Sequence, residues 1–276
     1  MSEEVLDELL AARRSRTPCA LVTVAATRGS VPRAPGSKML VYASGAFTGT
    51  IGGGKFESLV IEDARQQMRE KQPLLKNYPL HESSPESFGA ICGGEATVLI
   101  EPQALSEAIF LIGGGHCALA ISNLALECGL FVTVVDDRVE VLKNFPAQTM
   151  IVSDVAPSNF IASREWQPDE ALAIVSRHHE IDREALAAAL KTHGAGYIGM
   201  IGSDRKVKRV FDQLRQLGVS EGSLARVYAP LGLDIGADSP AEIAISVVAE
   251  ILAVLRGREA GHLRDSAGPR PASEVR

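Results

Sequence analysis

The sequence predicts an α/β protein, with a small N-terminal α/β domain followed by a Rossmann-like domain built on a doubly wound parallel sheet. One observation is the regular alternation of short apolar runs with helical patterns from residue 108 onward, which is typical of a parallel sheet covered by helices. A second is that Phe110–Ile112 leads into Gly113-Gly-Gly-His-Cys-Ala118, and that the next apolar run ends at Asp136. Strand, glycine turn, helix, strand and acid follow one another in this order in dinucleotide-binding units.

The length and composition fit this prediction. A chain of 276 residues is long enough for about two domains, which we expect at 1–103 and 104–257, with a polar, disordered tail at 258–276. A net charge of −6 gives no general attraction to nucleic acid or to an anionic membrane. No apolar run is long enough to span a bilayer.

The cysteines and the acidic start indicate a cytoplasmic protein. The four cysteines form no C-x-x-C pair, which argues against a disulfide framework or a structural zinc site. The first residues lack the basic-then-apolar order of a signal peptide.

The first domain is expected to contain two helices and a set of strands. Residues 3–14 place Val5, Leu6, Leu9 and Leu10 on one side of a helix. The segment from Arg28 to Gly36 cannot be helical, because two prolines and two glycines interrupt it. The other expected elements are strands at 19–27, 38–42, 46–51, 74–80 and 95–101, the last closed by Pro102, and a helix at 55–70.

A glycine-rich turn in this domain resembles a nucleotide P-loop. Gly49 to Lys55 matches most of G-x-x-x-x-G-K-[ST], but Phe56 replaces the hydroxyl residue that would hold Mg²⁺, so an NTPase is rejected. The backbone N–H groups of Gly52, Gly53 and Gly54, next to Lys55, are candidates to hold an anion. The alternative is a turn that needs glycine only for close packing.

Three further side chains in the first domain are candidate ligand contacts. Arg28 and Arg33 lie on a proline-stiffened loop, where a guanidinium suits a phosphate or carboxylate; otherwise they are solvated surface residues. Cys92 lies before two glycines, which favours an accessible thiol that binds a soft metal or sulfur. Its alternative is a small buried residue.

The second domain is expected to alternate strands and helices throughout. The segment 115–128 is apolar over most of its surface, as in a helix buried against a sheet. Ser239-Pro-Ala-Glu242 is a capping box that starts a helix ending near Leu255. The other expected elements are strands at 131–135, 149–152, 171–175 and 197–201, and helices at 183–192 and 205–215. The apolar C-terminal helix favours a homodimer.

The glycine turn of the second domain has the spacing of a pyrophosphate-binding turn. Gly113, Gly115 and Ala118 occupy the three small positions of G-x-G-x-x-[GA]. The first glycine permits a tight turn, the second lets backbone approach a pyrophosphate, and the third residue allows close helix packing. Asp136 would then accept hydrogen bonds from a ribose.

Residues that follow the strands give a candidate site, because ligands of open parallel sheets bind at the carboxyl ends of the strands. His116 and Cys117 lie in the first turn of a helix, whose dipole favours a thiolate and disfavours an imidazolium. His179 is a candidate general base or hydrogen-bond donor to a phosphate. Ser203 either contacts a ligand or caps its helix. The full set of positions is Gly113 to His116, Asp136, Asp137, Arg177 to His179, and Gly202 to Arg205. A Ser-His-Asp hydrolase is disfavoured because the sequence has no G-x-S-x-G motif.

Taken together, these segments resemble the XdhC/CoxI family, the accessory proteins of xanthine dehydrogenase and related molybdenum hydroxylases. Ser176 to Asp182 is similar to the family's T-[HR]-x-H-x-x-D stretch, with Ser176 in place of the threonine, and singles out His179 and Asp182. Asp204 replaces a basic residue. The other matching segments are Gly29–Lys38, Gly49–Glu57, Cys92–Glu95, Gly113–His116, Asp136–Arg138, Tyr197–Ser203 and Gly232–Pro240.

The resemblance implies a carrier of the molybdenum cofactor (molybdopterin). Such a carrier binds the cofactor, protects it during sulfuration by a cysteine desulfurase and assists its insertion into the apo form of a xanthine dehydrogenase-type enzyme. We expect the two glycine turns to face one cleft, with Cys92 at the metal or its transferable sulfur.

Two other classes of protein remain open. The second domain also suits an NAD(P)-dependent oxidoreductase, although no lysine or tyrosine lies in a recognisable hydride-transfer motif. A structural protein that has lost its ligands is the third possibility.

Overall fold

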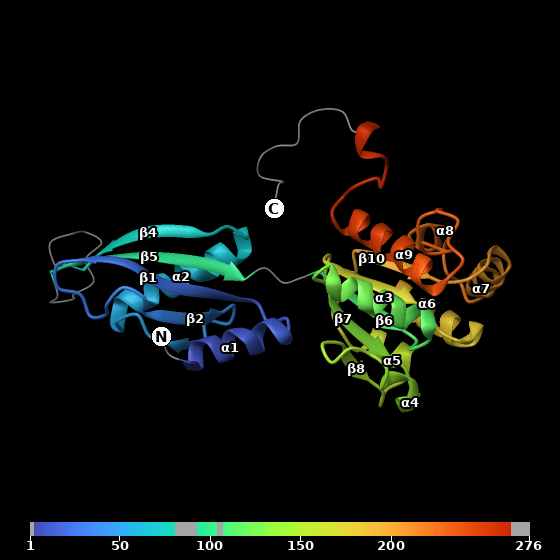
Figure 1. Cartoon of the computed structure of the whole chain (residues 1–276), viewed down its shortest axis with the longest axis horizontal. Coiled ribbons are helices and arrows are strands. Elements are labelled where there is room, and N and C mark those ends of the chain that lie inside the picture. The colour runs from blue at the N-terminus through green and yellow to red at the C-terminus, as the bar shows by residue number, and fades with distance from the viewer. Residues whose placement is uncertain (1–2, 81–92, 104–106, 266–276) are drawn as a thin grey trace. The chain divides into compact units, whose positions relative to one another are not determined.

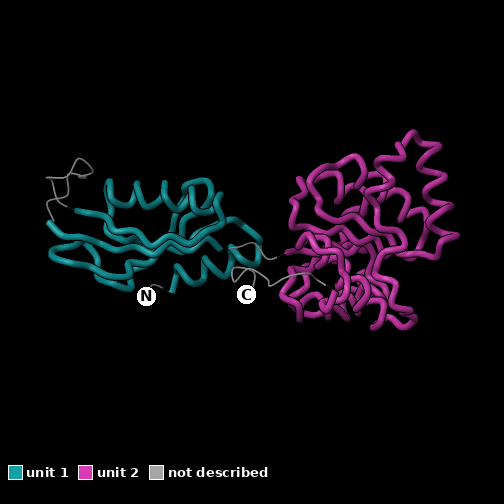
Figure 2. The backbone as a smooth tube through the Cα atoms, turned by 90° about the horizontal axis from the view of Figure 1, so that it is seen from above, with its two compact units in different colours: residues 1–105 teal, residues 106–276 magenta. Residues whose placement is uncertain are grey.

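The computed structural model describes residues 3–80, 93–103 and 107–265 (Figure 1). The chain forms two compact units, residues 1–105 and 106–276 (Figure 2). The observed architecture confirms the predicted fold class, a small N-terminal α/β unit followed by a Rossmann-type unit.

Unit 1 is a five-stranded antiparallel sheet in the order β3-β2-β1-β5-β4, with a helix on each face. Alternate residues of a strand point to opposite faces: Cys19 packs with Val5 of α1, whereas Ala20 and Val22 pack with Phe56 of α2. The elements are α1 (Glu3–Arg14), β1 (Cys19–Arg28), β2 (Lys38–Tyr42), β3 (Phe47–Gly49), α2 (Gly54–Glu70), β4 (Leu74–Pro79) and β5 (Glu95–Gln103).

Strand β5 does not stop at Pro102 as expected but continues to Gln103. Its neighbour β4 pairs with it only as far as Ile100, whereas β1 pairs with it to the end. One edge of β5 is therefore unpaired at Pro102, and an unpaired edge is where a strand tolerates proline.

Unit 2 contains a five-stranded parallel sheet in the order β10-β9-β6-β7-β8. Counted in chain order from β6, this is the arrangement 3-2-1-4-5 of a doubly wound fold, with β9 and β10 on one side of β6 and β7 and β8 on the other. All residues of β6 and β9 are buried, as expected for strands covered on both faces. The strands are β6 (Ala108–Ile112), β7 (Phe131–Val135), β8 (Met150–Val152), β9 (Glu170–Ile174) and β10 (Tyr197–Met200).

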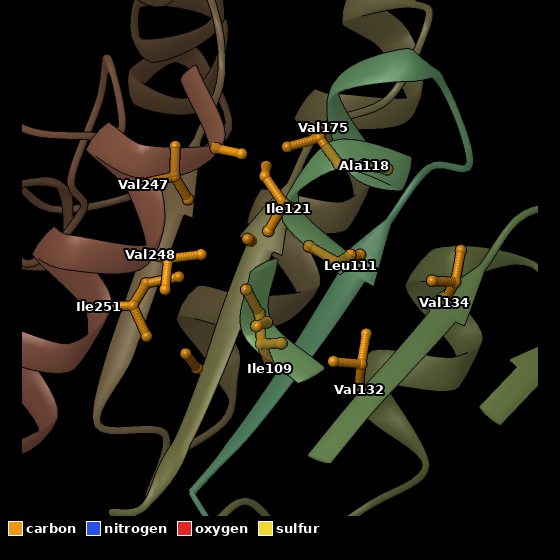
Figure 3. Close-up of a cluster of buried hydrophobic side chains, with 14 of the residues drawn as sticks. Ile109, Leu111, Ala118, Ile121, Val132, Val134, Val175, Val247, Val248 and Ile251 are labelled. Atoms are coloured by element: carbon orange, nitrogen blue, oxygen red, sulfur yellow. The ribbon is translucent and has the colours of Figure 1, made fainter. Parts of the chain in front are cut away.

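Helices cover both faces of this sheet. On one face, Ile121 of α3 (His116–Glu127) and Val247, Val248 and Ile251 of α9 (Pro240–Leu255) pack on Ile109 and Leu111 (Figure 3). The other face packs against α5 (Pro157–Ala162), α6 (His179–Lys191), α7 (Asp204–Gln216) and α8 (Glu221–Leu224). Helix α4 (Val139–Leu142) and the 3₁₀ turn η1 (Leu263–Asp265) are short additional elements.

The starts of three helices can be compared with the sequence-based predictions. The capping box at Ser239 and Glu242 is confirmed, and Ser203 caps α7 by accepting a hydrogen bond from the Lys206 N–H. Helix α6 begins at His179, four residues before the expected start at Arg183. The early start brings Asp182 into the first turn of α6, where it makes a buried contact described below.

The apolar character of α9 is largely explained within unit 2. Its buried residues pack on α3 and the sheet, whereas Ile245 remains 53% exposed. The helix therefore gives no separate indication of a homodimer, which stays a prediction. Among the described helices, none has the length and apolar content needed to cross a membrane.

Candidate functional site

The glycine turn of unit 1 already holds a carboxylate from the same chain. The Glu57 side chain, only 8% exposed, accepts hydrogen bonds from the N–H groups of Ile51 (2.9 Å) and Gly52 (3.1 Å) and from the Thr50 hydroxyl. Burial raises the pKa of Glu57, but the hydrogen bonds from Thr50 and from the backbone of Gly53, Ile51 and Gly52 outweigh it and lower the pKa. From the sequence, the N–H groups of Gly52, Gly53 and Gly54 are candidates to hold an external anion, and Glu57 is not singled out as an acceptor.

The proline-stiffened loop packs directly on this turn and on the segment after Cys92. A Cβ atom on Gly52 would lie 2.4 Å from Pro32 Cγ, and one on Gly94 would lie 2.3 Å from the Ser30 carbonyl oxygen. Glycine is therefore required at both positions by close packing. These contacts gather the loop, the turn and Gly94 where β1 ends and β5 begins.

Three candidate cations belong to these segments. Arg28 ends β1, Arg33 follows Pro32, and Lys55 is in the first turn of α2. All three side chains are exposed. Cys92, the fourth candidate of this domain, lies outside the described residues.

The glycine turn of unit 2 uses its first two small positions differently. Gly113 has a φ of +117°, and a Cβ atom there would lie 2.7 Å from the Val175 carbonyl oxygen. Gly113 is thus needed where the turn touches the loop after β9. A Cβ atom on Gly115, the N-cap of α3, would meet no atom within 4 Å, so the backbone of Gly115 is open to approach.

Asp136 follows β7, and its carboxylate already accepts hydrogen bonds from other groups of the protein. It accepts hydrogen bonds from the Gly114 N–H (2.7 Å) and from the Arg138 N–H (2.9 Å), Nε (2.9 Å) and guanidinium NH2 group (2.7 Å). Burial raises the pKa of Asp136, but the Arg138 hydrogen bond and the backbone N–H groups outweigh it and lower the pKa to about 2. A carboxylate has about four acceptor sites, so the ribose contact expected for Asp136 has no unused acceptor.

A second arginine reaches the same place from the loop after β9. Arg177 donates to both carboxylate oxygens of Asp137 (3.0 and 3.3 Å), and its NH1 group lies 3.7 Å from Asp136 Oδ1. Arg177 and Asp137 line a pocket together with Gly113, Asp136, Pro157 and Ser176. The structure thus brings Gly113, Asp136 and Arg177 together, as expected of residues that follow neighbouring strands.

Asp182 anchors the loop that carries Arg177. The Asp182 side chain is fully buried, and it accepts a hydrogen bond from the Ser176 hydroxyl (2.7 Å) and pairs with Lys206 Nζ (2.5 Å). A Cβ atom on Gly202 would lie 2.8 Å from Lys206 Cδ, so glycine leaves room for the lysine side chain. Lys206 is not among the residues singled out from the sequence, because the Asp182–Lys206 pair joins two helices that are separated in the chain by β10.

The remaining candidates lie around the same edge of the sheet. His116 is exposed in the first turn of α3, and His179 is half-buried at the start of α6. Burial raises the pKa of the Cys117 thiol, which opposes the preference of a helix N-terminus for a thiolate. The described residues contain no group of three or more His, Cys, Asp or Glu side chains placed to hold a metal ion.

Both units match models of one protein family. The model described as the XdhC Rossmann domain matches residues 109–251, and the model described as the XdhC and CoxI family matches residues 12–79. The chain therefore belongs to the XdhC and CoxI family, and the resemblance stated from the sequence is confirmed.

Two curated relatives are similar to this chain over different lengths. An Escherichia coli (strain K12) protein described as uncharacterized protein YqeB is 35% identical over 254 residues, which are 91% of this chain and 46% of that protein. A Bacillus subtilis (strain 168) protein described as a probable xanthine dehydrogenase subunit is 31% identical over 155 residues, 55% of this chain and 43% of that protein. The chain thus spans about half the length of the E. coli relative.

One solved structure is similar over most of its length. The crystal structure of a Bacillus halodurans protein described as a xanthine dehydrogenase aligns with a TM-score of 0.48 and 22% sequence identity, covering 96% of this chain and 98% of that chain.

Proposed function

We propose that this protein serves the maturation of a xanthine dehydrogenase-type molybdenum hydroxylase in the cytoplasm. In this role it binds the molybdenum cofactor, holds it during sulfuration by a cysteine desulfurase and assists its insertion into the apo-enzyme. Support comes from the family match in both units and from the B. subtilis relative described as a probable xanthine dehydrogenase subunit.

The observation that carries the proposal is the packing at one end of the unit 1 sheet. The close contacts of Gly52 with Pro32 and of Gly94 with Ser30 hold the candidate segments of unit 1 against one another. The exposed cations Arg28, Arg33 and Lys55 belong to those segments. Arginine and lysine side chains suit the phosphate of a pterin cofactor.

In unit 1, the cationic side chains fit the phosphate of the cofactor better than the backbone N–H groups of the glycine turn do. Glu57 already accepts hydrogen bonds from Ile51 and Gly52, so a phosphate would bind the guanidinium and ammonium groups instead. The bound cofactor supplies a metal held by sulfur ligands, and we propose that the thiol of Cys92 contacts that metal or its transferable sulfur.

The experiment compares the full-length protein with Cys92→Ala and Cys128→Ala variants, each coproduced with the molybdenum cofactor. Cys128 is an exposed free cysteine on unit 2 and serves as the matched control. Molybdenum and pterin content are measured first, and then the activity that each protein restores to an apo molybdenum hydroxylase. We expect Cys92→Ala to lose bound molybdenum and transfer, and Cys128→Ala to retain both. Undiminished loading and transfer with Cys92→Ala would exclude the proposed role of Cys92.

The oxidoreductase alternative predicts a different result. Titration with NADH or NADPH in the presence of small carbonyl or alcohol substrates would show turnover of the nucleotide. Catalytic turnover of the nucleotide by the molybdenum-free protein would show that the protein is an oxidoreductase and not a cofactor carrier. The proposed homodimer is tested separately, by light scattering of the purified chain.

A further inference from the structure

The crevice in unit 2 lies where this fold places a nucleotide. Strands β6 and β9 are neighbours, but the helices that follow them, α3 and α6, cover opposite faces of the sheet. Such a reversal opens a crevice beyond the carboxyl ends of the strands. The pocket lies there, bordered by Gly113 on one side and by Ser176 and Arg177 on the other.

The acid at this position is not available to a ribose. In nucleotide-binding units of this type, the acid after the second strand accepts hydrogen bonds from the ribose hydroxyls. Here Asp136 is 6% exposed and already accepts from Gly114 and three times from Arg138. A nucleotide with free ribose hydroxyls would find these acceptor sites filled.

Two arginines stand where the ribose hydroxyls would be recognised. The side chains of Arg138 and Arg177 are 35% and 33% exposed, and both reach the Asp136 carboxylate, at 2.7 Å and 3.7 Å. Their guanidinium groups therefore converge from the loops after β7 and β9. Paired guanidinium groups match the oxygens of a phosphate, and an arginine near this acid accommodates a ribose 2′-phosphate in nucleotide-binding folds.

We propose that this crevice binds a nucleotide whose ribose carries a 2′-phosphate, the chemical class of NADPH, in preference to one with free ribose hydroxyls. Arg177 and Arg138 contact the phosphate. The open backbone of Gly115 at the start of α3 lies on the path of the pyrophosphate. This site is independent of the proposed cofactor-carrying role of unit 1.

Asp137 regulates how strongly the crevice binds. It pairs with Arg177 through both oxygens, but its own side chain is 64% exposed. Exposed ion pairs are weak, so a phosphate dianion displaces Asp137 from Arg177. Removal of the Asp137 charge therefore tightens phosphate binding, which a merely structural ion pair would not do.

The test is calorimetric titration of the full chain with NADPH and NADH, and with 2′-AMP and 5′-AMP to isolate the position of the phosphate. We expect NADPH to bind at least about tenfold more tightly than NADH, and 2′-AMP more tightly than 5′-AMP. Arg177→Ala removes this preference, Asp137→Asn strengthens it, and the control Arg209→Ala, an exposed arginine of α7, leaves it unchanged.

Three outcomes would overturn the inference: equal or tighter binding of NADH, equal binding of the two adenosine phosphates, or no binding of any of the four ligands. If Arg177→Ala does not fold, the Asp137→Asn variant alone tests the inference. Weaker or unchanged NADPH binding by Asp137→Asn would contradict the proposed competition between Asp137 and the phosphate for Arg177. Molybdenum loading of Arg177→Ala separates this site from the carrier function, since loading depends on unit 1 in the proposal above.

Discussion

Lys206 of α7 forms an ion pair with the fully buried carboxylate of Asp182 of α6, with 2.5 Å between Nζ and Oδ2. Because Asp182 also accepts the Ser176 hydroxyl, this pair fixes the loop that presents Arg177. The contact between the two helices thus positions a residue of the crevice.

The Lys206→Met substitution should therefore destabilise unit 2 strongly. It leaves a buried charge without its partner, which costs about 3 kcal/mol. The matched control is Lys208→Met, since Lys208 is exposed on the same helix. Urea unfolding followed by far-UV circular dichroism measures both. Equal midpoints for the two variants would show that the Asp182–Lys206 pair contributes nothing.

A second prediction concerns the carboxylate inside the glycine turn of unit 1. Glu57→Ala leaves the N–H groups of Ile51 and Gly52 without their acceptor, at a cost of about 2 kcal/mol. Glu62→Ala, on an exposed position of the same helix, is expected to change stability by less than about 0.5 kcal/mol. Thermal unfolding of unit 1 monitors both variants. A Glu57→Ala variant as stable as Glu62→Ala would mean that solvent satisfies these N–H groups equally well.

Most of the fold could be predicted from the sequence because the signals are local. The apolar runs of β6 and β7, the glycines of the turn between them and the capping box of α9 each depend on neighbouring residues. The missed contact of Lys206 with Asp182 depends instead on the packing of two helices. Glu57 was missed for another reason, since its spacing from the turn resembles that of any helical glutamate. Asp136 was assigned correctly to the edge of the sheet, but its neighbour Arg138 changes what it can bind.

Two of the three glycines of the unit 2 turn, Gly113 and Gly115, should respond differently to alanine. Gly113→Ala places a Cβ atom 2.7 Å from backbone at a φ of +117°, and strain of this kind costs about 1–3 kcal/mol. Gly115→Ala meets no atom within 4 Å and starts from a φ of −74°, so it should leave the melting temperature nearly unchanged. If the pyrophosphate approaches Gly115, the same variant weakens NADPH binding. A large loss of stability in Gly115→Ala, without loss in Gly113→Ala, contradicts both assignments.

Acid should destabilise unit 2 through Asp136. The folded protein lowers the pKa of this carboxyl from 3.8 to about 2, so the folded state binds its proton less readily than the unfolded state. The resulting stability is present in full above about pH 4 and is lost as the pH falls toward 2, a loss of about 2 kcal/mol. Urea unfolding of the wild type and of Asp136→Asn at pH values from 2 to 6, about one unit apart, measures the difference. The two stabilities should converge as the pH falls, because the asparagine variant lacks this titration. A constant difference across the range would show that Asp136 does not carry the acid sensitivity of unit 2.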